Sequence, residues 1–471
     1  MEEAPAIAVE NSPTVLSVNE KKSLRDKLQS SRLISCIAGA VVLFASFGIR
    51  QTIGVFLVPV TSDTGWDRST FSLAAGIFQL FWGFSQPFLV YFAERKFGFG
   101  KSIFASCVLY AVGLLIVYAS PVSSGLFIFA YGIVTGFASG GNSFPIVLAS
   151  IGQRFAQKSK EQAIAFGLVS SFGSLGQVVF LPVAREMVVT IGWRLSFIVF
   201  GVFMGAISPL AYFLQTITPP SPSPSKSTIA YNSEKLGIDE TFTEKEQEQH
   251  LESQPKQIEL DNTTQRKEPE DIKSALKEAL TSPTFLMITL GFSVCGFHVT
   301  FLATHFPAYL QDQGVDPSIA AWTISILGAG SMIGSIGAGF ITGFISPRIT
   351  LTFVYLLRAI LIAVFVFIPT TETTALVFSC LFGFLWLSTV PVTTKFIGDV
   401  FGHKFLGTLT SVSFCGHQVG SFLGSLLGGI LLDTQKSYTS MWYGSLALAL
   451  LAVIANFFAE GVPGFTRKNS F

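Results

Sequence analysis

Charged side chains are scarce in this sequence. Asp, Glu, Lys and Arg make up 13% of its 471 residues, whereas a soluble protein carries about 25% because water has to solvate its surface. The formal net charge is only +1, which offers no basic field for nucleic acid. Most of the surface is therefore expected to face something other than water, and a soluble domain is excluded.

Patterns that hold metals, nucleotides or catalytic groups are also missing. No Walker loop occurs, which argues against an ATP-driven pump. Of the five histidines only His298 and His305 are close in sequence, and no acidic residue lies near them. The five cysteines form no CxxC pair and lie in apolar runs, as packing residues do; they are Cys36, Cys107, Cys295, Cys380 and Cys415. We expect no enzyme, no metal site and no cofactor.

Long apolar runs are what the sequence has in abundance. Each run is long enough, as a helix, to cross a hydrocarbon core of about 30 Å. A dozen such runs in series cannot all be buried helices of a soluble core. The expected spans are 33–59, 70–92, 102–119, 125–150, 162–184 and 193–215, then 284–311, 318–343, 349–369, 373–397, 405–432 and 438–460.

The polar segments divide the chain into parts. The tail 1–32 is no signal peptide, because the run after Arg32 is too long for an h-region. The linker 216–283 is rich in Pro, Ser, Gln and acidic residues and is expected to be largely disordered. Its end, Asp271–Leu280, reads as an amphipathic helix at the membrane surface. The expected parts are the tail 1–32, a six-helix bundle 33–215, the linker 216–283, a second six-helix bundle 284–460 and the tail 461–471.

Lys and Arg are distributed unequally among the short loops. Cytoplasmic loops carry an excess of these residues, so the distribution predicts that both termini are cytoplasmic. The inner loops hold Arg95, Lys96, Lys101, Arg154, Lys158, Lys160, Arg348 and Lys404, and the outer loops hold Arg68, Arg185, Arg194 and Lys436.

Two segments repeat each other across the halves, Gly152–Gln177 and Gly398–Gln418. Each begins at the end of the fourth span of its half and runs into the fifth. The matched pairs are Phe155 with Phe401, Gly167 with Gly407 and Gly176 with Gly416, which places Gln177 opposite His417. Two parallel six-helix repeats are the layout of the major facilitator fold, in which substrate binds between the halves near the midplane.

Several stretches resemble the monocarboxylate-porter-like branch of the major facilitator superfamily. They are GIRQTIGVFLVP at 48–59, GFSQPFLVYFAERKFGFGK at 83–101, GWR at 192–194, THFPAYL at 304–310 and LWLSTVPVT at 385–393. The resemblance implies an all-α membrane protein with twelve transmembrane helices in two pseudo-symmetric halves. Two departures stand out: Glu94 replaces the aspartate of the loop motif, and the eighth span lacks the Asp–Arg pair that proton-linked members of this branch use.

Arg50 is the first candidate for binding substrate. An ionisable residue inside a membrane helix is costly, and a guanidinium group grips a carboxylate through two parallel hydrogen bonds. Ser46 and Gly54 lie on the same small-polar face, where the other half or a water-filled cavity approaches. The alternative is a structural cation that bonds backbone carbonyls or a gate residue.

Polar residues of the seventh span share a helical face: His298, His305 and Tyr309. We assign His305 and Tyr309 to substrate binding and His298 to a proton or polar relay, because histidine titrates near neutral pH. The alternative is that both histidines are neutral and satisfied within the bundle. The remaining candidates for the relay are Gln177, His417 and Gln418, which also suit bonds between helices.

Other polar residues complete the candidate set. Asn142 in the fourth span and Trp386, Thr389 and Thr393 on one face of the tenth are expected to line the substrate cavity. A second group carries charge with a gating or structural role. In it, Glu94 and Arg95 form an inter-helix network, Arg358 packs on a loop or snorkels, and Lys395 marks a gate or an inner helix end.

These features together predict a secondary active or facilitative carrier that works by alternating access. Arg50 favours a small organic anion, in particular a monocarboxylate. The alternatives are a carrier for a non-carboxylate solute and a nutrient sensor that does not transport. No Asp or Glu lies inside a predicted span, so proton symport, uniport and exchange all stay open, as does the choice between the plasma membrane and an internal one. The expected partners are the solute, the lipid bilayer and, in a symporter, a co-transported proton.

Overall fold

The computed structural model describes residues 31–155, 160–215, 271–402 and 405–460. Within these ranges the chain is helical and contains no strand, which confirms the all-α prediction. The predicted tails and most of the predicted linker lie outside the described residues.

Eleven segments are long and apolar enough to cross a bilayer. One of them, Ile164–Leu214, has 51 residues and contains two crossings, because Gly192 takes a left-handed φ of 79° that interrupts the helix. The ring of Phe180 packs against Phe200 and Phe203 from the other side of this glycine, at 5.8 and 5.7 Å between centroids. The chain therefore folds back at Gly192, so this segment crosses twice. The eleven segments then make twelve crossings, as predicted.

The crossings follow each other in chain order. The first six are formed by α2 (Arg32–Gln51) continued by α3 (Ile53–Thr64), α4 (Arg68–Phe92) with η1 (Ala93–Phe97), α5 (Phe99–Val117), α6 (Ser124–Phe127) with η3 (Ile128–Thr135), α7 (Gly136–Gly140) and α8 (Phe144–Gly152), and α9 (Lys160–Ile207) with η4 (Ser208–Leu214). After α12 (Ile272–Thr281), the last six are α13 (Pro283–Asp312), α14 (Pro317–Ile341), α15 (Pro347–Phe367), α16 (Glu372–Leu385) with α17 (Thr389–Phe401), α18 (Leu406–Gln435) and α19 (Thr439–Phe458).

Local sequence signals set several helix ends. Asp316 caps α14 by accepting a hydrogen bond from the Ser318 amide at 2.8 Å, and a proline follows at the first helical position. The predicted amphipathic helix is confirmed as α12, and Asp271 caps it through the Ser274 amide at 2.9 Å. Gly65, with a φ of 70°, ends α3.

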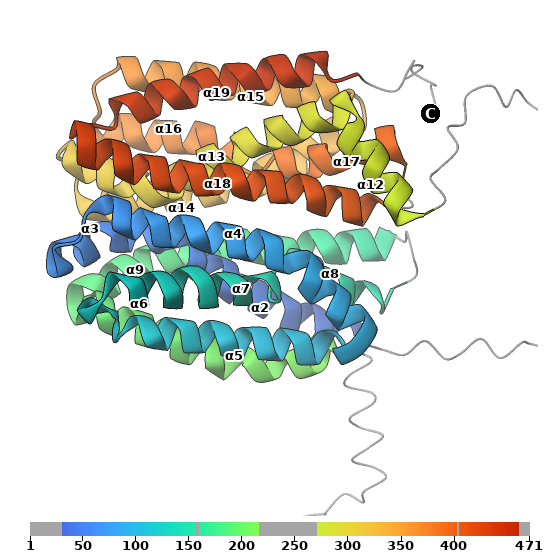
Figure 1. Ribbon diagram of the computed structural model, residues 1–471, viewed down its shortest axis with the longest axis horizontal. Coiled ribbons are helices and arrows are strands. Elements are labelled where there is room, and N and C mark those ends of the chain that lie inside the picture. The colour runs from blue at the N-terminus through green and yellow to red at the C-terminus, as the bar shows by residue number, and fades with distance from the viewer. Residues whose placement is uncertain (1–30, 156–159, 216–270, 403–404, 461–471) are drawn as a thin grey trace, which may run out of the picture.

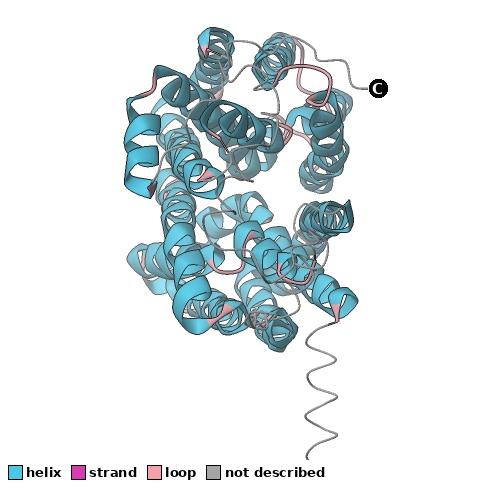
Figure 2. Cartoon of the chain, turned by 90° about the vertical axis from the view of Figure 1, so that its right-hand side faces the viewer, coloured by secondary structure: helices cyan, strands magenta, loops and turns pink. Residues whose placement is uncertain are grey.

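The helices form two bundles that lie one above the other in Figure 1. The N-terminal bundle contains α2 to η4 and the C-terminal bundle contains α12 to α19. We call the end where α2 begins and α19 ends the proximal end, and the opposite end, which carries Gly65 and Lys436, the distal end. Figure 2 looks along the helices from the proximal side and shows both bundles in cross-section.

The outer surface of the bundles is strongly apolar. Phe340, Phe344 and Phe367 have exposed fractions of 71%, 75% and 74%. Large exposed apolar surfaces of this kind need a nonaqueous neighbour, and helices satisfy their own backbone groups in lipid. The protein is therefore a multi-pass integral membrane protein.

Three crossings are broken within their length. The first breaks at Thr52, the fourth between Gly140 and Phe144, and the tenth between Leu385 and Thr389. The prediction of continuous helices over 33–59, 125–150 and 373–397 is wrong at these points. Non-helical backbone at membrane depth is tolerated only inside protein or beside a cavity, so the breaks direct attention to the interior.

Candidate functional site

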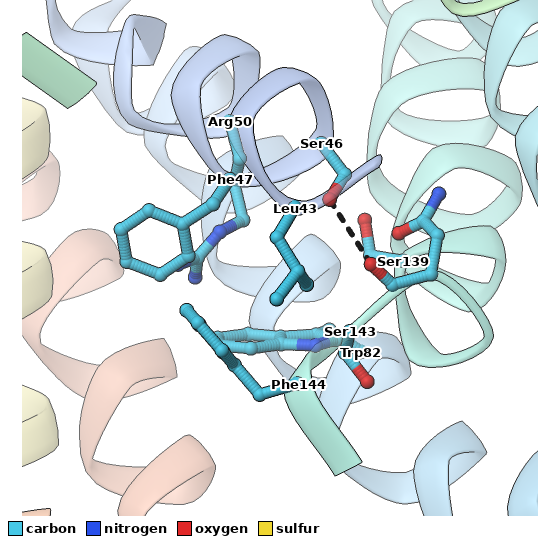
Figure 3. Close-up of a pocket in the computed structure, with 9 residues that line it drawn as sticks. Leu43, Ser46, Phe47, Arg50, Trp82, Ser139, Ser143 and Phe144 are labelled. Carbon is cyan, nitrogen blue, oxygen red and sulfur yellow. Dashed lines mark hydrogen bonds between the residues drawn. The ribbon is translucent and has the colours of Figure 1, made fainter. Parts of the chain in front are cut away.

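A recess lies in the N-terminal bundle beside the break in the fourth crossing (Figure 3). Helices α2, α4, α7 and α8 all contribute to its wall. The lining residues are Leu43, Ser46, Phe47, Arg50, Trp82, Ser139, Asn142, Ser143 and Phe144. Two of the predicted substrate-binding residues, Arg50 and Asn142, therefore meet in one place.

Arg50 provides the positive charge of the recess. It lies in the last turn of α2 with an exposed fraction of 8%, and no other described residue forms an ion pair or a hydrogen bond with its side chain. Its guanidinium carbon is instead 3.9 Å from the ring centroid of Trp82 and 4.4 Å from that of Phe47. Aromatic faces stabilise a cation only in part, so the recess retains an unneutralised charge.

Two polar groups near Arg50 have no hydrogen-bond partner among the described residues. The Nδ2 atom of Asn142 and the hydroxyl of Tyr110, on α5, are buried without a hydrogen-bond partner. Ser46 donates to the backbone oxygen of Asn142 at 3.0 Å, which fixes the break against α2. Buried charge and buried donors are costly when unmatched. The arrangement suits a ligand that brings negative charge and acceptor oxygens.

The small-polar face of the first crossing behaves as predicted at its distal end. A Cβ atom on Gly54 would lie 2.1 Å from the backbone oxygen of Ala303 in the C-terminal bundle. Only glycine permits this approach of α3 to α13. The other half does approach this face.

The polar face of the seventh crossing lies outside the recess. The Nε2 atom of His298 lies 2.9 Å from the Ser445 oxygen on α19, and the Nδ1 atom of His305 lies 3.0 Å from the Tyr438 hydroxyl. The ring of Tyr309 packs edge to face on Tyr438. This face meets the twelfth crossing through His298 and His305, and His305 also contacts α18 and α4; it does not line the recess around Arg50.

The polar face predicted for the tenth crossing is interrupted. Trp386 caps the end of α16 and Thr389 begins α17, so the spacing of a continuous helix does not apply between them. Trp386 and Thr393 are buried, and the Thr389 hydroxyl lies 3.0 Å from the Cys295 sulfur. None of the three lines the recess in the N-terminal bundle.

Arg358 was expected to contact a loop or to snorkel, and this prediction is wrong. The side chain is fully buried, and its Nη2 atom donates to the backbone oxygens of Leu385 and Trp386, the latter at 2.7 Å. The break in the tenth crossing frees carbonyl groups at the end of α16, and a guanidinium group supplies the missing donors. Arg358 therefore stabilises the break.

Two glutamines connect the bundles in a pseudo-symmetric way. Gln177 on α9 donates to the Ile324 oxygen on α14 at 3.0 Å, and Gln418 on α18 donates to the Gln79 oxygen on α4 at 3.1 Å. In each case a fifth helix of one half bonds the second helix of the other. The contacts make Gln418 the counterpart of Gln177, so the sequence alignment that chose His417 was displaced by one residue. His417 bonds the Gln418 side chain at 2.8 Å.

The remaining predicted charges lie toward the proximal end. Glu94 and Arg95 belong to η1, and their side chains lie outside the described part of the structure. Lys395 forms an ion pair with Asp399, one turn further along α17, at 2.9 Å.

A cluster at the distal end ties the bundles together, and its first component is Arg68 at the start of α4. Its side chain makes two bonds to Asp312, at 2.6 and 2.8 Å. Asp433 on α18 accepts hydrogen bonds from the backbone amides of Arg68 and Ser69, at 3.2 and 2.7 Å. A carboxylate of one bundle thus caps a helix of the other.

His305 lies within the same cluster. Its Nε2 atom is 2.7 Å from the Ser425 oxygen and 3.3 Å from the Ser72 hydroxyl. A carbonyl oxygen only accepts, so Nε2 carries the proton and Nδ1 accepts from Tyr438. Tyr438 in turn accepts from Arg68 at 3.2 Å. We define the distal cluster as Arg68, Ser69, Ser72, His305, Asp312, Ser425, Asp433 and Tyr438.

The sequence reasoning missed the aromatic wall of the recess and most of the distal cluster. Phe47, Trp82 and Phe144 were three of many aromatic residues in apolar runs, and no periodicity distinguishes a ring that faces a cation from one that faces lipid. One signal was present: Gly140–Ser143 reads GGNS before Phe-Pro, a typical turn sequence inside an apolar run.

Comparisons with known proteins agree with this architecture. The family model described as Major Facilitator Superfamily matches residues 39–394. The "Uncharacterized MFS-type transporter YcxA" of Bacillus subtilis is 21% identical over 397 residues, which is 83% of this chain and 85% of that protein. "Monocarboxylate transporter 7" of Homo sapiens is 23% identical over 448 residues, 87% of this chain and 82% of that protein. A solved structure of a bacterial homologue of the human lysosomal transporter Spinster superposes with a TM-score of 0.64 at 15% identity, over 91% of this chain and 94% of that one.

Proposed function

Given that the chain belongs to the Major Facilitator Superfamily and is a transporter rather than an enzyme, we propose that its solute is a small organic anion, in particular a monocarboxylate. The observation that carries this proposal is Arg50, a buried guanidinium group that faces a recess without a carboxylate to neutralise it. A substrate carboxylate supplies the missing charge through two parallel hydrogen bonds. The name of the human relative supports the same substrate class.

Transport proceeds by alternating access between two arrangements of the bundles. The distal cluster joins the bundles in the present arrangement through Arg68, Asp312 and Asp433. With both termini in the cytoplasm, as the distribution of Lys and Arg favours, the distal end faces the outside or the lumen. The structure then represents a state closed to that side, and outward opening breaks the cluster.

The proposal also covers how transport is coupled to protons. His305 lies in the distal cluster and not beside Arg50. If a proton drives transport by binding His305, it changes how firmly the two bundles close at the distal end. It does not take part in binding the substrate at Arg50. A gradient of protons is then expected to change the rate of transport without being required for carboxylate binding.

The experiment is uptake into proteoliposomes that contain the purified full chain. Radiolabelled acetate, lactate and benzoate are compared with neutral and cationic solutes, with and without an inward proton gradient. Saturable uptake of a carboxylate supports the proposal, and acceleration by the gradient supports symport. Uptake of neutral or cationic solutes alone contradicts the role of Arg50 while leaving the family assignment intact.

A further inference from the structure

We infer that Phe414 in the C-terminal bundle sets the affinity of the recess for its carboxylate, by holding the Trp82 ring on which Arg50 stacks. This inference rests on the proposed function and deepens it. Phe414 does not line the recess, so it is a positioning residue and does not touch the substrate. Binding of the carboxylate then depends on the arrangement of the two bundles.

The recess itself belongs to one bundle. All of its lining residues come from α2, α4, α7, α8 and the break before α8, which are parts of the N-terminal bundle. Within this wall the guanidinium carbon of Arg50 lies 3.9 Å from the ring centroid of Trp82 and 4.4 Å from that of Phe47 (Figure 3). The attraction between a cation and an aromatic ring depends on the position of the cation over the ring face. The orientation of the Trp82 ring therefore fixes how the guanidinium group is presented to a carboxylate.

A ring contact joins this wall to the other bundle. Trp82, on α4, packs edge to face with Phe414, on α18, at 5.3 Å between ring centroids and 83° between ring planes. The other two rings of the wall, Phe47 and Phe144, pack on each other within the N-terminal bundle. Edge-to-face pairs are directional, so Phe414 holds the plane of the indole ring as well as its position.

Close packing of two helices brings Phe414 to this place. A Cβ atom on Gly83 of α4 would lie 2.4 Å from the Cγ atom of Gln418, one turn after Phe414 on α18. Glycine at this position therefore permits the approach of the helices. On its own side of the interface, the Phe414 ring stacks on His417 at 5.3 Å and packs against Phe292 of α13 at 6.2 Å. These neighbours fix Phe414 to the C-terminal bundle.

A carrier that works by alternating access moves one bundle against the other. The recess moves as a unit with the N-terminal bundle, whereas the contact between Trp82 and Phe414 crosses the moving interface. A rearrangement of the bundles therefore changes the support of the indole ring and leaves the rest of the wall as it is. The affinity for the carboxylate then differs between the two arrangements. Such a difference is what a ligand needs in order to shift the equilibrium between them.

The test is the Kd of benzoate for the purified full chain, measured by calorimetry. Phe414→Leu removes the ring and keeps an apolar side chain. We expect this variant to raise the Kd about fivefold, equivalent to about 1 kcal/mol, which is the size of an aromatic pair. Phe414→Tyr keeps the ring and should bind benzoate with the Kd of the wild type.

Phe422→Leu is the matched control. Phe422 lies about two turns further along α18 and also faces α4, where a Cβ atom on Gly76 would lie 2.9 Å from its ring. Phe422 and Phe414 are both half-buried, so the two substitutions disturb the interface between the bundles in the same way. Phe422 does not pack on the wall of the recess through Trp82, and the Kd of benzoate should stay unchanged.

Arg50→Lys shows whether Phe414 acts through the guanidinium group. Lysine keeps the charge and loses the stacking on Trp82. In this background Phe414→Leu should cause no further change in Kd, because the stacking that Phe414 supports is already lost. A double-mutant cycle measures this dependence of one substitution on the other. A general loss of packing would instead add to the effect of Arg50→Lys.

The outcomes separate the inference from the proposed function. A higher Kd for Phe414→Leu that disappears in the Arg50→Lys background supports the inference. The inference is overturned, and the carboxylate carrier stands, if the wild type binds benzoate and Phe414→Leu leaves the Kd unchanged, raises it no more than Phe422→Leu does, or raises it equally in both backgrounds. Wild-type protein that binds none of benzoate, lactate and acetate, while binding neutral solutes, overturns the proposed function.

Discussion

Arg50 and Arg358 are both buried, but their surroundings differ. Arg358 donates to the carbonyl oxygens of Leu385 and Trp386, where the chain needs donors. Arg50 has only the faces of Phe47 and Trp82. Arg358 is held by the backbone through its Nη2 atom, although its Nε and Nη1 atoms have no hydrogen-bond partner. Arg50 lines a recess, and its charge is the one that the proposed carboxylate would neutralise.

Arg50→Lys tests the geometry of the guanidinium group at constant charge. Lysine keeps the positive charge but loses the planar fork and the stacking on Trp82. We expect KM for the transported carboxylate to rise by about tenfold, equivalent to about 1.4 kcal/mol, with a smaller change in kcat. Initial rates of uptake over a range of concentrations give both values. An unchanged KM would mean that charge alone binds the substrate.

Asp63 lies at the aqueous distal end, beyond the predicted first span, and predicts how the thermal stability of the protein depends on pH. Hydrogen bonds from the indole of Trp193 and from Arg194, each at 3.0 Å, lower the pKa of this carboxyl group. Because folding lowers the pKa of Asp63, these hydrogen bonds stabilise the folded protein fully above the pKa that Asp63 has in the unfolded chain. The stabilisation is lost as the pH falls through the pKa that Asp63 has in the folded protein. The difference in Tm between wild type and Asp63→Asn should therefore be present at neutral pH.

Thermal scans in detergent measure this difference. Below the ordinary aspartate pKa of about 3.9, the difference should shrink as Asp63 becomes protonated. Because the pair is exposed to water, the effect is small even at neutral pH. If the Tm difference between wild type and Asp63→Asn grew on acidification, the hydrogen bonds from Trp193 and Arg194 would not be the source of the stabilisation.

At the scale of the element, the N-terminus of α4 is capped by the opposite bundle. Asp433 accepts from the amides of Arg68 and Ser69, whereas Asp67, at the N-cap position of α4 itself, makes no capping bond. Loss of an N-cap costs about 1 kcal/mol. Asp433→Ala should therefore shift the bundles toward distal opening by about fivefold, since about 1.4 kcal/mol is tenfold in an equilibrium.

The distance between spin labels on Ser62 and Thr434, two exposed distal residues on different bundles, reports this shift. Asp433→Ala should increase the population at long distance. Asp399→Ala, which removes an ion-pair partner of Lys395 in α17, is the matched control and should leave the distances unchanged. Equal distributions in the Asp433 variant and wild type would show that the cap does not hold the bundles.

Asp67→Ala should act in the opposite direction. When the bundles separate, the first amides of α4 lose Asp433, and Asp67 is the carboxylate placed to replace it. Removal of Asp67 leaves the closed arrangement intact and destabilises the open one. The same pair of labels should then report a smaller population at long distance, and a larger one would contradict the exchange of caps.

The elements were predictable to different degrees. Hydropathy predicted the twelve crossings, because helices in lipid must satisfy their own backbone and bury apolar length. The amphipathic pattern of 271–280 predicted α12. The breaks in the first, fourth and tenth crossings were missed, because a few non-helical residues do not lower the hydropathy of a long window. The shared face of His298 and His305 was correct as geometry, but helical periodicity does not say which neighbour a face meets.

At the scale of the whole molecule, the two bundles are pseudo-symmetric in their contacts. Gln177 and Gln418 each reach from a fifth helix to a second helix of the other half. Arg50 and Asn142 were found from sequence because polar groups are rare in apolar runs. The distal cluster was not, because its residues come from loop ends whose spatial pairing is set by the packing of the bundles.

The central claim is that Arg50 binds a carboxylate during transport by the full chain. The most direct test is the ratio of benzoate uptake to benzamide uptake in proteoliposomes, compared between wild type and Arg50→Gln. We predict a high ratio in wild type and a collapse of benzoate uptake in the variant, with its Tm retained. Benzoate uptake that is equal in the two proteins, or a wild-type protein that transports only the amide, would contradict the claim.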